Sequence, residues 1–152
     1  MDYNQSEREA AATLRLGKKV ERATANPVTG DELFAVESGD CLITLLVGEV
    51  TSLLQTQSAT YKLVLDVDTG SDTDMSGTLN VNADEVGTLY TLHGTGSTGM
   101  QVGSSGSCIG PHTPIVVSPG GIDITVSTAH SGEVKWTLWY IPLAEGAYIT
   151  AS

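Results

Sequence analysis

Short segments in which apolar and polar residues alternate constrain this chain most, because they recur from residue 26 to the end of its 152 residues. Residues 61–68 read Tyr-Lys-Leu-Val-Leu-Asp-Val-Asp, and residues 75–82 and 122–127 alternate in the same way. A period of two is typical of a strand with one buried face and one solvated face. Turn-forming clusters of Gly, Pro, Asn, Asp and Ser separate these segments. About nine such strands predict an all-β fold, either an antiparallel β-sandwich or a jelly-roll-like domain.

Two segments are apolar on both faces and break this alternation. Trp136 and Trp139 are three residues apart in one predicted strand, so their side chains point to opposite faces. Residues 41–54 are also apolar on both faces, and over residues 42–54 a helix is the alternative to a strand. Either the chain itself covers both faces of these strands, or one face belongs to a subunit interface. The second interpretation predicts self-association through Trp139, Ile141, Leu53 and Leu54.

The charge is divided unevenly along the chain. Eighteen acidic and seven basic residues give a net charge of -11. The first 22 residues hold five basic and four acidic residues, a balance of +1, and the remaining 130 hold two basic and fourteen acidic residues, a balance of -12. Binding to nucleic acid or to an anionic membrane needs clustered Lys and Arg, so neither is expected as a partner. The apolar runs are also far shorter than the ~20 residues of a membrane span.

The charge boundary predicts two parts, an N-terminal arm over residues 1–22 and a β-sandwich domain over residues 23–152. Ser6 lies three residues before Glu9 and a run of alanines follows, which predicts a helix from about Ser6 to Leu16 in an otherwise extended arm. Its low apolar content leaves two interpretations, a frayed terminus or an arm that becomes ordered against a partner.

The segment from Gly94 to Gly99 matches the G-x-G-x-x-G pattern of dinucleotide-binding proteins. Such a site also needs a helix that begins at the glycines, and the following residues are rich in Gly, Ser and Gln. We therefore expect a long exposed loop from Gly94 to Gly106 and no cofactor.

Four carboxylates gather near a glycine and form the one candidate metal site. Calcium binds six to eight oxygens, but no glutamate closes this loop, so a solvated hairpin is the simpler interpretation. No nucleophile motif or zinc-ligand spacing is present, no catalytic residue is predicted, and we expect the chain not to be an enzyme. The candidate calcium ligands are Asp66, Asp68, Asp72 and Asp74.

Several stretches of the predicted β-domain resemble small virion proteins of tailed bacteriophages. They include residues 29–36 (TGDELFAV), 47–51 (VGEVT) and 132–148 (GEVKWTLWYIPLAEGAY), together with residues 74–79 and 86–90. The likeness covers most of residues 22–152 and is greatest to head-associated decoration or cement proteins. It implies a β-rich structural protein, present in many copies per particle, that binds the major capsid protein and has no enzymatic activity.

These observations predict a capsid decoration protein that stabilises the phage head as a homo-oligomer, a dimer or a trimer. It would lie on the capsid surface of the virion, and in the host cytoplasm during assembly, where a reducing compartment suits its two cysteines. The arm would contact the shell through its basic residues. These are Arg8, Arg15, Lys18, Lys19 and Arg22.

Two alternatives stay open. One is a receptor- or glycan-binding module of a head or tail fibre, with Trp139 or Tyr148 on a concave face beside the loop from Gly94 to Gly106. The other is a hydrolase that uses two carboxylates, which would have to meet in one cleft.

Overall fold

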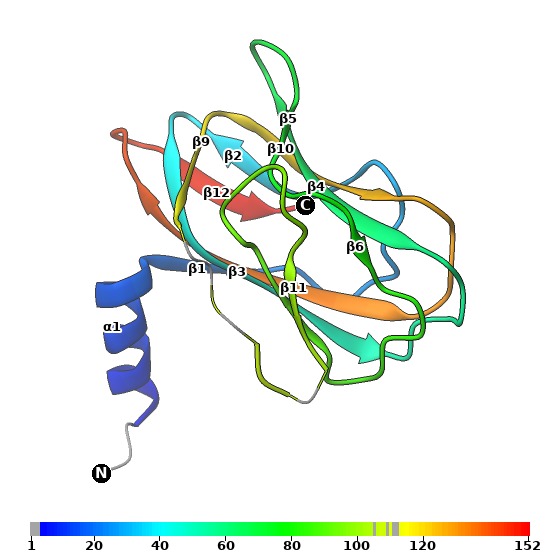
Figure 1. The fold of residues 1–152 in the computed structure, drawn as a ribbon. Coiled ribbons are helices and arrows are strands. Elements are labelled where there is room, and N and C mark those ends of the chain that lie inside the picture. Colours follow the sequence, from blue (N-terminus) through cyan, green and yellow to red (C-terminus); the bar gives the residue numbers. More distant parts are fainter. Residues whose placement is uncertain (1–3, 105, 109, 111–112) are drawn as a thin grey trace.

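A computed structural model describes residues 4–104, 106–108, 110 and 113–152, and in these residues the chain forms two antiparallel six-stranded sheets packed face to face (Figure 1). The first sheet has the order β1 (Lys18–Glu21), β11 (Glu133–Pro142), β3 (Cys41–Ser52), β7 (Leu89–Thr91) and β8 (Gln101–Gly103), with β9 (Ile115–Val117) also paired to β3. The second sheet has the order β12 (Tyr148–Ala151), β2 (Asp31–Glu37), β10 (Gly120–Val126), β4 (Thr60–Val67) and β5 (Thr73–Asp74), with β6 (Leu79–Asn80) also paired to β4. The prediction of an all-β sandwich is confirmed.

The pairing of β3 with β11 is the longest in the molecule and runs from Glu133 opposite Ser52 to Pro142 opposite Cys41. Residues 42–52 are therefore a strand, and the helical alternative for this segment is wrong. Trp136 lies opposite Gly48 and is buried in the core. A Cβ atom on Gly48 would come within 2.6 Å of the Trp136 ring, so only glycine leaves room for the indole.

In the second sheet, β10 lies between β2 and β4 and supplies Ile122 and Ile124 to the core. The alternation predicted for residues 61–67 and 122–126 is confirmed, since their apolar members face the first sheet. Residues 75–82 do not form one strand, because only Leu79–Asn80 is a strand there. The predicted alternation still holds for Met75 and Val81, which are buried, and for Thr78 and Asn80, which are exposed. Ser76 departs from it. Ser76 is buried instead, and its hydroxyl accepts a hydrogen bond from the Leu63 amide at 3.0 Å.

Hydrogen-bonded polar side chains close one end of the core. The Tyr61 hydroxyl lies 2.9 Å from His130 Nε2, and His130 Nδ1 lies 2.8 Å from the Ser131 carbonyl oxygen. The Tyr90 hydroxyl donates to Asp84. Burial raises the pKa of both tyrosines, and the bond to Asp84 raises that of Tyr90 further, so both phenols stay protonated. These bonds attach the loops that carry Asp84 and His130 to the two sheets.

The glycine-rich segment 94–106 is only in part the long exposed loop that we expected, since residues 95–98 are exposed but Gln101–Gly103 form a strand. It contains β8, which pairs with β7, and residues 96–99 pack against the segment after β5. The Gly77 amide donates to the Thr98 carbonyl at 2.9 Å. A Cβ atom on Gly96 would lie 2.4 Å from the Asp74 carbonyl oxygen, so this glycine permits a close approach of two backbones.

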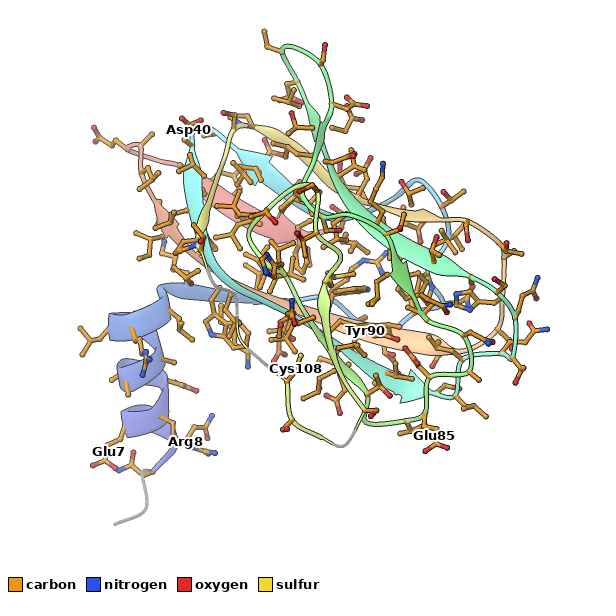
Figure 2. All side chains as sticks on the ribbon, viewed as in Figure 1. Glu7, Arg8, Asp40, Glu85, Tyr90 and Cys108 are labelled. Carbon is orange, nitrogen blue, oxygen red and sulfur yellow. The ribbon has the colours of Figure 1, made fainter. Side chains whose placement is uncertain are left out.

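The predicted N-terminal helix is present as α1 (Gln5–Leu16), but a different residue caps it. The Glu7 amide donates to the Asn4 side chain at 2.9 Å, and the Asn4 amide donates to the Glu7 carboxylate at 2.8 Å, so Asn4 and Glu7 form the capping box, not Ser6 and Glu9. No residue of α1 is buried, and the helix projects from the sandwich (Figure 1). Glu7 and Arg8 lie on this projecting part, whereas Tyr90 lies within the sandwich (Figure 2).

Residues 18–21 form β1 at the edge of the first sheet, so the last part of the predicted arm 1–22 lies within the sandwich. The projecting part ends at Gly17, which has a φ of +87°. A Cβ atom there would lie 2.0 Å from the Tyr140 carbonyl oxygen. The Thr44 hydroxyl also donates to the Leu16 carbonyl at 2.5 Å, which holds the end of α1 against β3.

We expect Gly48→Ala to lower the free energy of unfolding by about 1–3 kcal/mol, because the new methyl group overlaps the Trp136 ring in a packed core. Urea denaturation followed by tryptophan fluorescence measures the change. Gly110→Ala is the matched control, since no atom lies within 4 Å of the position of its Cβ. Equal stability of the two variants would contradict the packing assigned to Trp136.

Candidate functional site

The outer face of the first sheet carries the side chains that alternate with its core residues. Across the strands, Lys19 lies beside Trp139 and Trp139 beside Leu45. The next row is formed by Glu21, Thr137 and Val47, and Lys135 lies opposite Glu49 beyond it. Trp139 is thus the tryptophan that points away from the core, and the prediction that it and Trp136 lie on opposite faces is confirmed.

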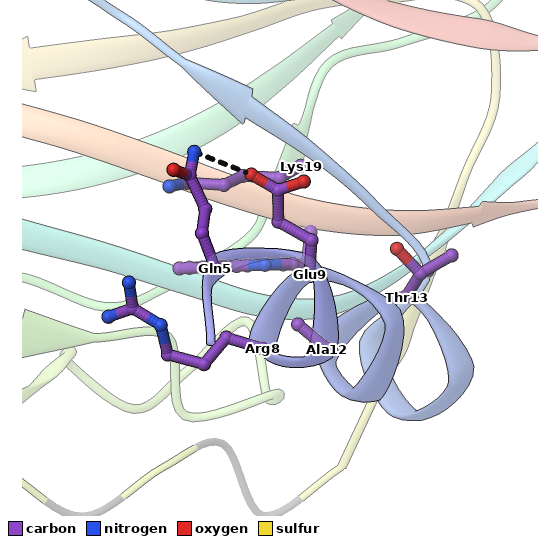
Figure 3. A pocket seen from close by; sticks show the side chains of 8 residues that line it. Gln5, Arg8, Glu9, Ala12, Thr13 and Lys19 are labelled. Atoms are coloured by element: carbon purple, nitrogen blue, oxygen red, sulfur yellow. Dashed lines mark hydrogen bonds between the residues drawn. The ribbon is translucent and has the colours of Figure 1, made fainter. Parts of the chain in front are cut away.

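Helix α1 stands over this face and leaves a cleft of about 370 Å³ between itself and Trp139 (Figure 3). A second hollow of about 250 Å³ continues along the sheet and shares Lys19 and Trp139 with the first. We call the two together the α1 groove. Its lining is formed by Gln5, Arg8, Glu9, Ala12, Thr13, Gly17, Lys19, Glu21, Val47, Glu49, Lys135, Thr137 and Trp139.

The charges inside the α1 groove neutralise one another. Lys19 Nζ lies 2.6 Å from one carboxylate oxygen of Glu21 and Lys135 Nζ lies 3.8 Å from the other. The hydrogen bond and charge of Lys19, with the charge of Lys135, hold the pKa of Glu21 below its ordinary value of 4.5. The Lys19 ammonium also lies 5.9 Å from the centre of the Trp139 ring. Three basic and three acidic residues line the groove, so its formal charge is zero.

The five predicted arm residues lie in three different places. Arg8 and Lys19 line the α1 groove. Arg15 and Lys18 are exposed where α1 joins β1. Arg22 is held by the body, because its Nε donates to the Ser152 carbonyl at 3.0 Å and its guanidinium lies 4.0 Å from Asp31. The arm therefore does not present one continuous basic surface.

The residues predicted to mediate self-association also separate. Trp139 and Ile141 share the outer face of the first sheet, where Ile141 is 38% exposed. Leu53 is 57% exposed but lies next to Gly132, at the other end of β11, roughly 25–30 Å from Ile141 at the rise of a strand. Leu54 is only 1% exposed and belongs to the core, so it is not available to a second subunit.

An apolar row that the sequence analysis missed extends from Ile141 across the first sheet. Ile141 lies opposite Leu42, and Leu42 lies opposite Val116 of β9, which is 57% exposed. The three-residue strand β9 is too short for its alternation to be recognised. Its position beside β3 depends on a long-range pairing that no local pattern reveals.

The acidic cluster forms the β4–β5 hairpin. Asp66, Asp68, Asp72 and Asp74 are all exposed, and Asp74 pairs with Lys62 at 2.9 Å. Within the described part of the chain, no three His, Cys, Asp or Glu side chains are grouped so that they could hold a metal ion. The structure does not bring the four candidate calcium ligands together.

The features that the two alternatives require are spread over the molecule. Tyr148 lies on β12 of the second sheet, whereas Trp139 lies on β11 of the first sheet. The glycine-rich segment contains β8, which β3 and β7 separate from β11. No single face therefore collects the aromatic residues of a glycan platform with that segment. No Asp or Glu among the described residues is buried. Glu21 and Glu49 line the same hollow of the first sheet, and both are exposed.

A second acidic group lies on the outer face of the second sheet, where sequence order did not reveal it. Glu32 and Asp123 are paired across β2 and β10, and their carboxylates approach the position that a Cβ atom of Gly121 would occupy. Burial, together with the charges of Asp66 and Glu32, raises the pKa of Asp123 above its ordinary value of 3.8.

Comparison with protein-family models, curated proteins and solved structures found no match to this chain. Within the described residues, no helix has the length and apolar character needed to cross a membrane. The role of the α1 groove therefore has to be argued from its own geometry and charge.

We expect NMR titration to place the pKa of Glu21 below 4.5 and Lys19→Gln to raise it toward that value. A lowered pKa means that this ion pair stabilises the fold above pH 4.5 and that its contribution is lost as the pH falls through the pKa of the folded state. Lys62→Gln, on the second sheet, is the control and should leave the pKa of Glu21 unchanged. An unchanged pKa of Glu21 in the Lys19→Gln variant would contradict the assigned ion pair.

Asp123→Asn should raise the free energy of unfolding at pH 7 by about 0.5 kcal/mol, because it removes the cost of burying a charge and the repulsion from like charges across the strands. A raised carboxyl pKa destabilises the fold while the group is ionised, so the gain should fade as the pH falls through the pKa of the folded state and be absent below 3.8. Thermal unfolding of both proteins across this range measures it, with Asp68→Asn on the exposed hairpin as the control. A gain that persists in acid would contradict the electrostatic explanation.

Proposed function

We propose that this chain is a structural protein of a tailed-bacteriophage particle that binds the major capsid protein shell and stabilises the head as a decoration protein. The observation that carries this proposal is α1, a 12-residue helix that is capped at both ends yet buries no residue. Isolated helices of this length are marginal in water, so α1 gains most of its order from whatever it contacts. A projecting element of this kind suits attachment to a large surface.

Arg15 and Lys18 are the cations best placed for that contact. Both are exposed at the junction of α1 and β1, whereas Arg8 and Lys19 face the α1 groove and Arg22 is bound to the body. The Gly17 backbone and the bond from Thr44 to Leu16 fix this junction on the sheet. The two cations would therefore meet acidic groups of the shell at a defined position.

The acidic sandwich suits a protein that is displayed in many copies on a capsid surface. Its net negative charge keeps neighbouring copies apart and soluble, because like charges repel. Many weak contacts between the arms and the repeating capsid lattice would together attach the protein strongly to the shell. In this proposal the chain lies in the host cytoplasm before assembly and on the capsid surface of the virion afterwards.

Co-sedimentation with empty shells of the cognate major capsid protein tests the proposal. The truncation should remove residues 1–16 only, because loss of Lys18–Glu21 would uncover the edge of β11. We expect the truncated chain to stay folded and to lose at least about tenfold in affinity, the cost of about 1.4 kcal/mol of contact. Unchanged binding would refute a role of the arm, and absence of binding by the full chain would refute the proposal.

Paired charge reversals separate the cations from the helix itself. Arg15→Glu and Lys18→Glu should each weaken shell binding, and their combination should weaken it further, since both residues are exposed. Lys62→Glu, on the second sheet, is the control matched in charge to each single reversal. Equal weakening by the control would show that only overall charge matters.

A further inference from the structure

One face of α1 points away from the sandwich and is apolar over its C-terminal part, with Glu7 at its N-terminal end. Ala12 and Leu16 are half-buried on the side of the sheet, whereas Leu14 is 90% exposed. At 3.6 residues per turn, Ala10 and Ala11 share the outward side with Leu14. Most stable surface helices bury such a face, and here it has no partner within the described chain.

The α1 groove offers an equally unpartnered surface next to this helix. Trp139, Val47 and Thr137 form its floor. The apolar row of Ile141, Leu42 and Val116 continues from it along the same face. The outward apolar residues of the helix and the uncharged floor of the groove thus lie on one side of the molecule.

Charge identifies the partner that this side can accept. Three basic and three acidic residues cancel within the groove, while fifteen acidic and four basic residues lie outside it. Two copies of a chain with a net charge of -11 repel one another through most of their surfaces, and the acidic outer face of the second sheet is an example. The neutral groove side is where a second copy meets least repulsion.

We infer that two copies of this chain associate through this side, with α1 of each copy lying alongside α1 of the other. The face of Ala10, Ala11 and Leu14 then packs on Trp139 and Val47 of the opposite copy. The same two surfaces are used by both copies, as a two-fold symmetric contact requires. The shell-binding cations Arg15 and Lys18 are not needed for this contact, so the inference does not depend on the proposed function.

The available area is sufficient for a reversible dimer. The strands β1, β11 and β3 have 4, 10 and 12 residues, and at a spacing of about 4.8 Å and a rise of about 3.3 Å they cover roughly 400 Å². A 12-residue helix adds roughly 180 Å². The total of roughly 600 Å² lies at the lower end of what each partner contributes to a standard protein interface.

Sedimentation velocity of the full chain tests this inference from about 1 µM to about 1 mM, the range of a moderate dissociation constant. We expect a monomer–dimer equilibrium that Leu14→Glu weakens at least about tenfold. Val86→Glu is the matched control, because Val86 is 63% exposed in the turn before β7 and lies outside the α1 groove. Circular dichroism should show that both variants keep the native fold.

Thr137→Glu places a charge on the groove floor and should weaken the dimer as Leu14→Glu does. Added salt should strengthen the association, because it screens the repulsion between two acidic chains. A monomer at every concentration, a dimer that neither variant weakens, or a dimer that salt dissolves would each overturn the inference. The sedimentation experiment contains no shell protein, so it tests the dimer alone. A chain that dimerises but does not bind shells would refute only the proposed function.

Discussion

The pairing of β3 with β11 is the constraint on which the rest of the first sheet depends. β1 attaches to the free side of β11, while β7 and β9 attach to β3. The register places Gly48 beneath Trp136 and leaves Trp139 on the opposite face. A one-residue slip would exchange the two faces and put polar side chains into the core, so core packing fixes the outer surface as well.

The position of α1 follows from this sheet. Gly17 passes so close to Tyr140 that no side chain fits there, and Thr44 binds the last carbonyl of the helix. The helix is therefore held at its C-terminal end while its length projects over Trp139 without burying a side chain. The α1 groove is a consequence of this junction and of the outward tryptophan together.

Local patterns predicted the elements that bury one complete face or carry their own capping residues. The alternation in residues 61–67 and 122–126 and the helix near residues 5–16 are of this kind. The capping residue itself was placed wrongly, because Ser6 and Asn4 both have a suitable residue three positions later. Leu54 was assigned to an interface although it is a core residue, since one apolar side chain looks the same in either place. The short strands β8 and β9 were missed because three residues show no period.

The sequence by itself determined the all-β class, the placement of Trp136 and Trp139 on opposite faces of one strand, and the separation of charge between the first 22 residues and the rest. These follow from the alternation of side chains along a strand and from simple composition, which need no long-range contact. Only the tertiary structure decided that Lys18–Glu21 joins the sheet, that the basic residues divide between groove, junction and body, and that the groove is neutral. Those properties depend on which distant strands become neighbours, and burial of the shared core selects that pairing.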